Sequence, residues 1–92
     1  MGAAAVQASQ IEAAVRAAIE PITTLEVINE SHLHAGHAGA DEGSHWRVRL
    51  VSARLAGLTP VARHRLGYDA LRPLLAQGIH ALAIDAKAAS PA

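Results

Sequence analysis

Histidines are the residues of this chain with the clearest capacity for chemistry, and four of the six lie within residues 31–46. That segment reads SHLHAGHAGADEGSHW and contains His32, His34, His37 and His45. Imidazole binds zinc and nickel, and the interspersed glycines would let the segment wrap around an ion. No fourth ligand and no fixed secondary structure is evident, so the segment on its own predicts only weak, adventitious metal binding.

The composition limits what could complete such a site. The chain has 92 residues, enough for one domain with a modest core, and it has no cysteine that could form a disulfide or provide a thiolate ligand. A metal centre must therefore use His, Asp, Glu or groups from another protein. There is also no pair of acids in an apolar setting and no phosphate-cradling glycine motif, so we do not expect an enzyme. No run approaches membrane-spanning length, which predicts a soluble, cytoplasmic protein without a membrane partner.

Five elements should position the histidines. Hydrophobic periodicity and turn residues predict helix, strand, strand, helix and strand in that order, at residues 10–20, 23–29, 46–51, 60–77 and 79–84. The histidine-rich segment is then a long exposed connection between the first two strands. We expect a single small domain over residues 9–85, with a flexible N-terminus at residues 1–8 and a flexible tail at residues 86–92.

Local signals mark the ends of the two helices. Ser9 and Glu12 fit a capping box before the first helix. Thr59 suits the N-cap of the second helix and Pro60 its first position. Pro73 lies inside this second helix, where it removes a backbone donor, so we expect a kink or a fresh short turn there.

The second helix should bury one apolar face. At helical spacing, this face contains Val61, His64, Tyr68, Leu71 and Leu75. His64 is therefore expected to be a structural histidine on the apolar side of the helix.

The order of elements has a consequence for His80. The first two strands should pair antiparallel, and the second and third, joined through a helix, should be parallel with a right-handed crossover. The result is a three-stranded mixed sheet of the α/β (α+β) class. Parallel strands begin at the same end of a sheet, so His80 should lie near His45 and Trp46, where the long connection enters the second strand.

The charges are unevenly distributed, although the formal net charge is zero. Residues 1–46 contain six acids against one arginine, and residues 47–72 contain six arginines against one aspartate. Arginines at 54, 63, 65 and 72, with the turn at Gly57, could contact phosphates, as in DNA; a solvated polar face is the alternative. The run Gly57-Leu58-Thr59-Pro60 lacks the second glycine of a GXXG clamp, so only modest, salt-sensitive DNA binding is expected.

Several separated motifs resemble the BolA family in order and spacing. They cover about residues 19–84 and comprise Asn29-Glu30-Ser31-His32, Ser44-His45-Trp46-Arg47-Val48, Val51-Ser52, Gly57, Arg63-His64-Arg65, Tyr68 and His80-Ala81-Leu82. The resemblance implies a small α/β fold similar to class II KH domains, in agreement with the order of elements above. It also implies a role as a partner of monothiol glutaredoxins in iron-sulfur and iron homeostasis, or, in bacteria, as a DNA-binding transcriptional regulator of stress responses.

The resemblance also implies a ligand set for a 2Fe-2S cluster shared with the glutaredoxin. The position of the family histidine near the last strand matches His80, and the second ligand, from the loop after the first strand, matches His34 or His37. The glutaredoxin side would supply its cysteine and a glutathione thiol, so the isolated chain is expected to hold no cofactor. His32 and His45 would brace the ends of the loop.

Three residues depart from the family pattern. Leu55 stands where an aromatic residue is usual, Gly67 replaces a bulky aliphatic residue, and Pro73 interrupts the second helix. These departures affect the packing of the second helix and leave the ligand positions unchanged.

Overall fold

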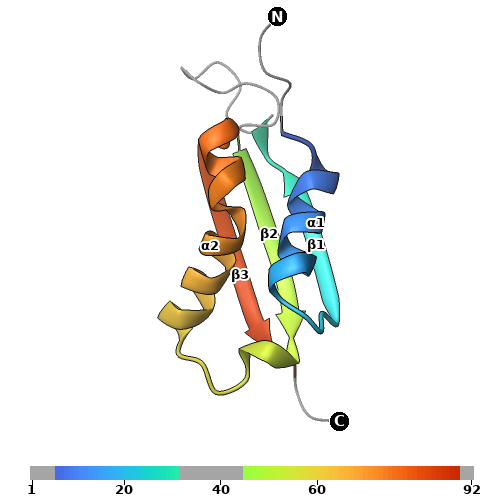
Figure 1. Cartoon of the computed structure of the whole chain (residues 1–92), viewed down its shortest axis with the longest axis vertical. Coiled ribbons are helices and arrows are strands. Elements are labelled where there is room, and N and C mark those ends of the chain that lie inside the picture. Colours follow the sequence, from blue (N-terminus) through green and yellow to red (C-terminus); the bar gives the residue numbers. More distant parts are fainter. Residues whose placement is uncertain (1–5, 32–44, 90–92) are drawn as a thin grey trace, which may run out of the picture.

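The computed structural model describes residues 6–31 and 45–89, and its elements follow the predicted order (Figure 1). They are α1 (Ala8–Ala18), β1 (Thr24–Asn29), β2 (His45–Ser52), the short 3₁₀ helix η2 (Ala53–Leu55), α2 (Pro60–Gln77) and β3 (Ala81–Ala88). No helix in the described ranges is long and apolar enough to cross a membrane.

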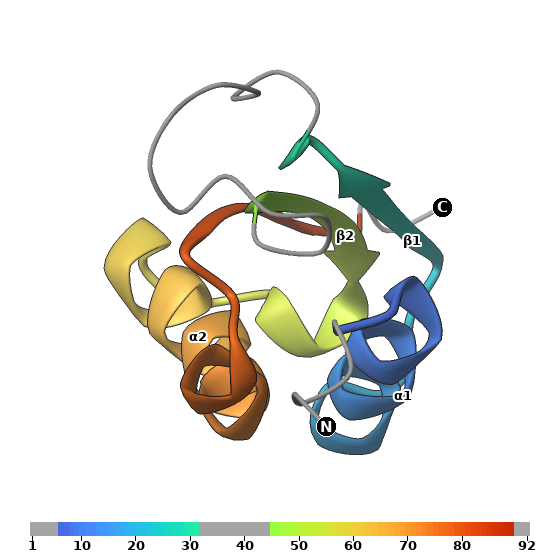
Figure 2. The ribbon, with the colours of Figure 1, turned by 90° about the horizontal axis from the view of Figure 1, so that it is seen from above.

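The three strands form one mixed sheet in the order β1-β2-β3. β1 and β2 are antiparallel, with Asn29 opposite Trp46, and β2 and β3 are parallel, with His45 opposite Ala81. Both helices lie on one face of this sheet, as the view in Figure 2 shows. The predicted two-helix, three-stranded α+β architecture is therefore confirmed.

The core lies between the helices and the central strand. In α1 the apolar residues that face the core recur every three to four residues, and in β2 every second residue from Trp46 to Leu50 is apolar and faces the core. The buried side chains are Ile11, Val15 and Ile19 from the α1 region, Trp46, Val48 and Leu50 from β2, and Val6, Leu55, Leu71, Leu74 and Ile79 around them. The alternation in β2 leaves its arginines, Arg47 and Arg49, on the face away from the helices, as predicted.

The first helix begins earlier and the last strand ends later than predicted. The first helix begins after Gln7, whose backbone N–H donates to the Gln10 side chain at 2.7 Å, so Ser9 and Glu12 are not its capping pair. Val6 is already buried, within the stretch expected to be flexible. β3 continues to Ala88, three residues beyond the expected end of the domain, because alternating small residues can still pair with the full length of β2.

The second helix begins where predicted. Thr59 accepts a hydrogen bond from Ala62 N at 3.1 Å, and Pro60 is the first helical residue. The helix runs through Pro73 to Gln77, so no fresh turn starts at the proline. It ends at Gly78, whose φ of +143° favours glycine.

The buried face of α2 matches the prediction only in part: Leu71 is buried as expected, but His64 and Val61 are not. Gly67, Leu71 and Leu74 are its buried residues, whereas His64 is exposed and Val61 is 69% exposed. His64 is therefore not a structural core histidine. The reason is Gly67: a Cβ at this position would lie 3.2 Å from Ile84 Cδ1, so the absent side chain lets the helix approach β3 there and rotates the buried face toward it.

Candidate histidine site at one end of the sheet

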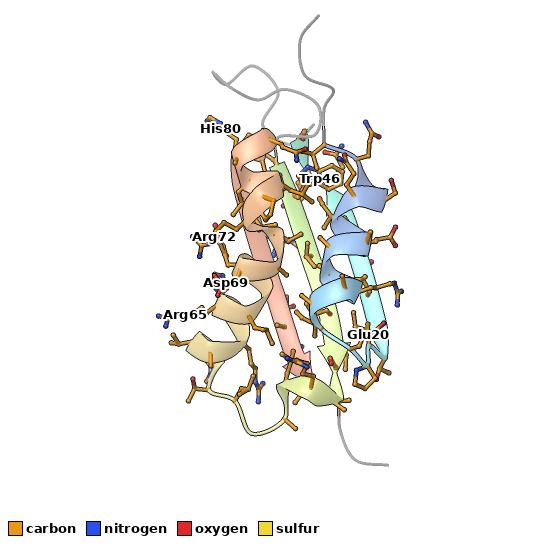
Figure 3. All side chains as sticks on the ribbon, in the orientation of Figure 1. Glu20, Trp46, Arg65, Asp69, Arg72 and His80 are labelled. Carbon is orange, nitrogen blue, oxygen red and sulfur yellow. The ribbon has the colours of Figure 1, made fainter. Side chains whose placement is uncertain are left out.

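The parallel pairing of β2 and β3 brings two histidines together. His45 opens β2 opposite Ala81, and His80 immediately precedes β3. The two imidazole ring centroids are 6.0 Å apart, with the ring planes at 45°. His80 is exposed, and Figure 3 shows it at the same end of the molecule as Trp46. The prediction that His80 lies near His45 and Trp46 is confirmed.

The buried Ser31 hydrogen-bonds to His45, so it links the residues on either side of the segment 32–44. Ser31 is 6% exposed, and its hydroxyl accepts from His45 N at 3.1 Å and donates to His45 O at 3.4 Å. The same carbonyl accepts from Glu30 N at 2.8 Å, and Ser31 N donates to Asn29 Oδ1 at 2.9 Å. These contacts hold the backbone of His45 against the end of β1. We call this set of hydrogen bonds the Ser31 clasp.

An ion pair braces the same end of the sheet. Arg47 Nε donates to Glu30 Oε2 at 2.9 Å, and the side chains are 36% and 21% exposed. Two residues further along β2, Arg49 lies directly opposite Glu26, with 3.7 Å between their charged atoms. Part of the basic charge expected in the second half of the chain is thus compensated by Glu26 of β1 and by Glu30 just after it.

The loop candidates His34 and His37, together with His32, lie outside the described residues. Among residues 6–31 and 45–89, no group of three or more His, Asp or Glu side chains is placed to hold a metal ion. The described chain therefore brings two imidazoles close together, one of them exposed, which are too few to hold a metal ion alone. Imidazole is a good ligand for iron and zinc, so a centre here would have to be completed by further groups.

The candidate phosphate-binding residues are spread along one side of the fold. Arg54 is an exposed residue of η2, and Gly57 forms the following turn with φ +81°. Arg63 is half-buried and its Nε donates to Leu58 O at 3.0 Å, so it also holds the turn. Arg65 lies on the outer side of α2, where Figure 3 also shows Asp69 and Arg72.

These arginines differ in their partners. Arg72 is paired with Asp69 one turn earlier in the helix. In the part of the chain that the structure describes, Arg54 and Arg65 have no acidic partner within ion-pair distance. Arg63 has none either, but its Nε already donates to the Leu58 carbonyl, so Arg54 and Arg65 are the exposed arginines of this side without an acidic partner among the described residues.

Sequence reasoning missed the clasp and the cross-strand ion pairs. The antiparallel register would have found the pairs, because aligning Asn29 with Trp46 places Glu26 opposite Arg49. The double hydrogen bond of Ser31 has no such signal, since a serine beside a loop is compatible with many local roles.

The fold and this site define a class: a small α+β domain with two helices on one face of a three-stranded mixed sheet and a histidine pair at one end. The family model for BolA-like proteins matches residues 15–90, and the chain belongs to the BolA family.

Relatives and solved structures agree with this assignment. The chain is 47% identical over 83 residues to BolA-like protein 1 of Mus musculus, covering 87% of this chain and 59% of that protein. It is 55% identical over 60 residues to the Vibrio cholerae protein named DNA-binding transcriptional regulator BolA, covering 65% and 55%. The structure of BolA1 from Arabidopsis thaliana matches with a TM-score of 0.78 at 36% identity, over 91% of this chain and 95% of that one. The chain spans somewhat more than half of the mouse and Vibrio proteins.

Proposed function

We propose that this chain is a non-enzymatic regulatory protein that shares a 2Fe-2S cluster with a monothiol glutaredoxin through histidine ligands. The observation that carries the proposal is the 6.0 Å approach of the His45 and His80 rings at the end of the sheet where the histidine-rich segment begins and ends. An exposed imidazole at a rigid strand end can reach a group held by another protein. The BolA membership of the chain makes this function the first to test.

The residues present fit such a group. His80 would hold the cluster together with His34 or His37, and the glutaredoxin would contribute its cysteine and a glutathione thiol. A chain without cysteine supplies no thiolate, so in a mixed set of imidazole and thiolate ligands it would supply the imidazoles. Imidazole ligation raises the reduction potential of such clusters, which is the chemistry the histidines would add. The Ser31 clasp and the Arg47–Glu30 ion pair would keep the sheet end in place while a partner docks.

Reconstitution tests the proposal. The chain is mixed with a monothiol glutaredoxin, glutathione, iron and sulfide, and the visible circular dichroism of the product is compared with that of the glutaredoxin homodimer. A heterocomplex with a distinct spectrum is expected. His80→Ala should return the homodimer spectrum, and either His34→Ala or His37→Ala should do the same.

The matched control is His64→Ala. His64 is also an exposed histidine, but it lies on α2 beside Tyr68, with ring centroids 5.1 Å apart, and outside the histidine pair. This variant should keep the spectrum of the heterocomplex. If His80→Ala, with its fold intact, gives the unaltered heterocomplex spectrum, His80 is not a ligand.

DNA-binding transcriptional regulation is the second candidate. Two observations favour it: the exposed, unneutralised Arg54 and Arg65, and the name of the Vibrio cholerae relative. Affinity for duplex DNA should fall steeply with salt, and Arg65→Ala should reduce the slope of log K against log salt by about 0.9 if it contacts one phosphate. Arg49→Ala, on the other side of the sheet, is the control and should leave the slope unchanged. Absence of any DNA binding at low salt would exclude this function.

A further inference from the structure

We propose that the outer edge of β3 is a self-association surface, at which two copies of this chain pair β3 antiparallel to β3 about a two-fold axis at Ala86. The proposal does not depend on the histidine site or on the proposed function. β3 ends the sheet, and within residues 6–31 and 45–89 no strand pairs with its outer edge. Figure 1 shows β3 beside β2, on the side away from β1.

The direction of the backbone groups on this edge follows from one hydrogen bond. Ala89 N donates to Ser52 O of β2 at 3.1 Å. Successive residues of a strand in a parallel ladder present their backbone groups to opposite sides, so Lys87 and Asp85 also face β2. Ile84, Ala86 and Ala88 then direct their N–H and C=O groups outward. An eight-residue strand with outward groups at three successive alternate positions is a template for another strand.

The charged side chains of β3 favour pairing with β3 of a second copy of this chain, in one register. Asp85 and Lys87 are exposed and lie on the sheet face away from the helices. With the two-fold axis at Ala86, Asp85 of each copy lies opposite Lys87 of the other, at a position where cross-strand side chains approach most closely. Shifting the axis by one residue, to Asp85 or to Lys87, places Asp85 opposite itself or Lys87 opposite itself. A second copy of the chain therefore matches this edge in one register.

The backbone pattern agrees with the same register. About an axis at Ala86, the outward-facing Ala86 pairs with its own copy, and Ile84 pairs with Ala88 of the other copy. In an antiparallel ladder, hydrogen-bonded residue pairs alternate with non-hydrogen-bonded pairs. These pairs take the hydrogen-bonded positions, and the Asp85–Lys87 pairs take the non-hydrogen-bonded positions between them. Four of the eight residues of the strand ALAIDAKA are alanines, so few side chains obstruct a close approach.

A groove lies along the middle of this edge. It has a volume of about 190 Å³ and is lined by Ile84, Asp85 and Ala86 of β3 together with Pro60, Arg63 and His64 at the start of α2. The groove can receive the methyl group of Ala86 from the second copy at the centre of the pairing.

Sedimentation equilibrium with charge-reversed variants tests the proposal. The wild-type chain should dimerise reversibly as its concentration rises from roughly 10 µM to 1 mM. Asp85→Lys places Lys opposite Lys in both symmetric pairs, and Lys87→Asp places Asp opposite Asp. Each variant alone should have a dissociation constant raised about tenfold or more.

Mixing the two variants gives the decisive result. In the mixed pair, both lysines of one chain face both aspartates of the other, so an equimolar mixture should form a heterodimer about as tight as the wild-type dimer. Asp85→Lys also places a lysine opposite Arg49 within its own sheet, and the rescue separates this effect from loss of the interface. Hydrogen exchange should slow with concentration at the amides of Ile84, Ala86 and Ala88.

Three results would overturn the proposal. A wild-type chain that stays monomeric at millimolar concentration has no such surface. A dimer that both single variants leave intact uses another interface. Variants that fail to associate with each other on mixing, although circular dichroism shows both folded, would exclude the Asp85–Lys87 register.

Discussion

Replacing Ser31 by alanine should loosen the end of the sheet that presents His80. The substitution removes both hydrogen bonds of a hydroxyl that is 6% exposed, one from His45 N and one to His45 O. The His45 carbonyl keeps its bond from Glu30 N, so the main loss is the acceptor of the His45 N–H. Removing one partner of a buried hydrogen bond typically costs about 1–2 kcal/mol of unfolding free energy.

The functional effect should exceed this stability loss. Ser31 bonds to the backbone of His45, which is not a proposed ligand but whose ring lies 6.0 Å from that of His80. Contacts that orient metal ligands change metal affinity by about 10–100-fold, and an indirect contact should act at the lower end of this range. At equal folded fractions, Ser31→Ala should therefore weaken the cluster-bound heterocomplex with a monothiol glutaredoxin about tenfold. Chemical denaturation measures the stability, and titration of the glutaredoxin followed by circular dichroism measures the heterocomplex.

Ser52→Ala is the matched control at the opposite end of β2. Ser52 is also buried, its hydroxyl donates to Pro21 O, and it accepts from Arg54 N at 3.1 Å. This variant should lose a similar unfolding free energy, about 1–3 kcal/mol, and keep the affinity of the heterocomplex. If both variants weaken the heterocomplex equally, or neither does, the clasp does not position the histidine site.

Other substitutions test the packing and the ion pairs. Arg47→Met breaks the half-buried pair with Glu30 and should lower the unfolding free energy by about 1 kcal/mol, whereas Arg72→Met, whose ion pair is exposed, should change it by less than about 0.5 kcal/mol. Equal effects in urea denaturation would mean that partial burial does not strengthen the first pair. Gly67→Val places a branched side chain against Ile84. The substitution should reduce the free energy of unfolding by about 1–3 kcal/mol and lower the midpoint of thermal unfolding. An unchanged midpoint would show that α2 can move away from β3 freely.

The sequence predicts the sheet well because its signals are local and periodic. Alternation in β2, the turn at Gly57 and the N-cap at Thr59 each require only neighbouring residues. The parallel crossover then follows from connectivity, and with it the meeting of His80 and His45.

Other features depend on contacts between distant residues. The buried face of α2 is set by the close approach of Gly67 to Ile84, and a pattern of large apolar residues ignores a glycine. The extension of β3 to Ala88 requires its pairing with β2, since its alanines alone do not favour a strand. The clasp depends on the hydrogen bonds of one hydroxyl, which composition does not reveal. The roles of His34 and His37 stay predictions.

Pulsed EPR of the reduced heterocomplex detects histidine ligation of the cluster directly. The chain is labelled with ¹⁵N-histidine, assembled with unlabelled monothiol glutaredoxin, glutathione, iron and sulfide, and reduced to make the cluster paramagnetic. Histidine ligation predicts strong ¹⁵N hyperfine coupling from this chain, lost in His80→Ala and retained in His64→Ala. A reduced heterocomplex without ¹⁵N coupling would contradict the account.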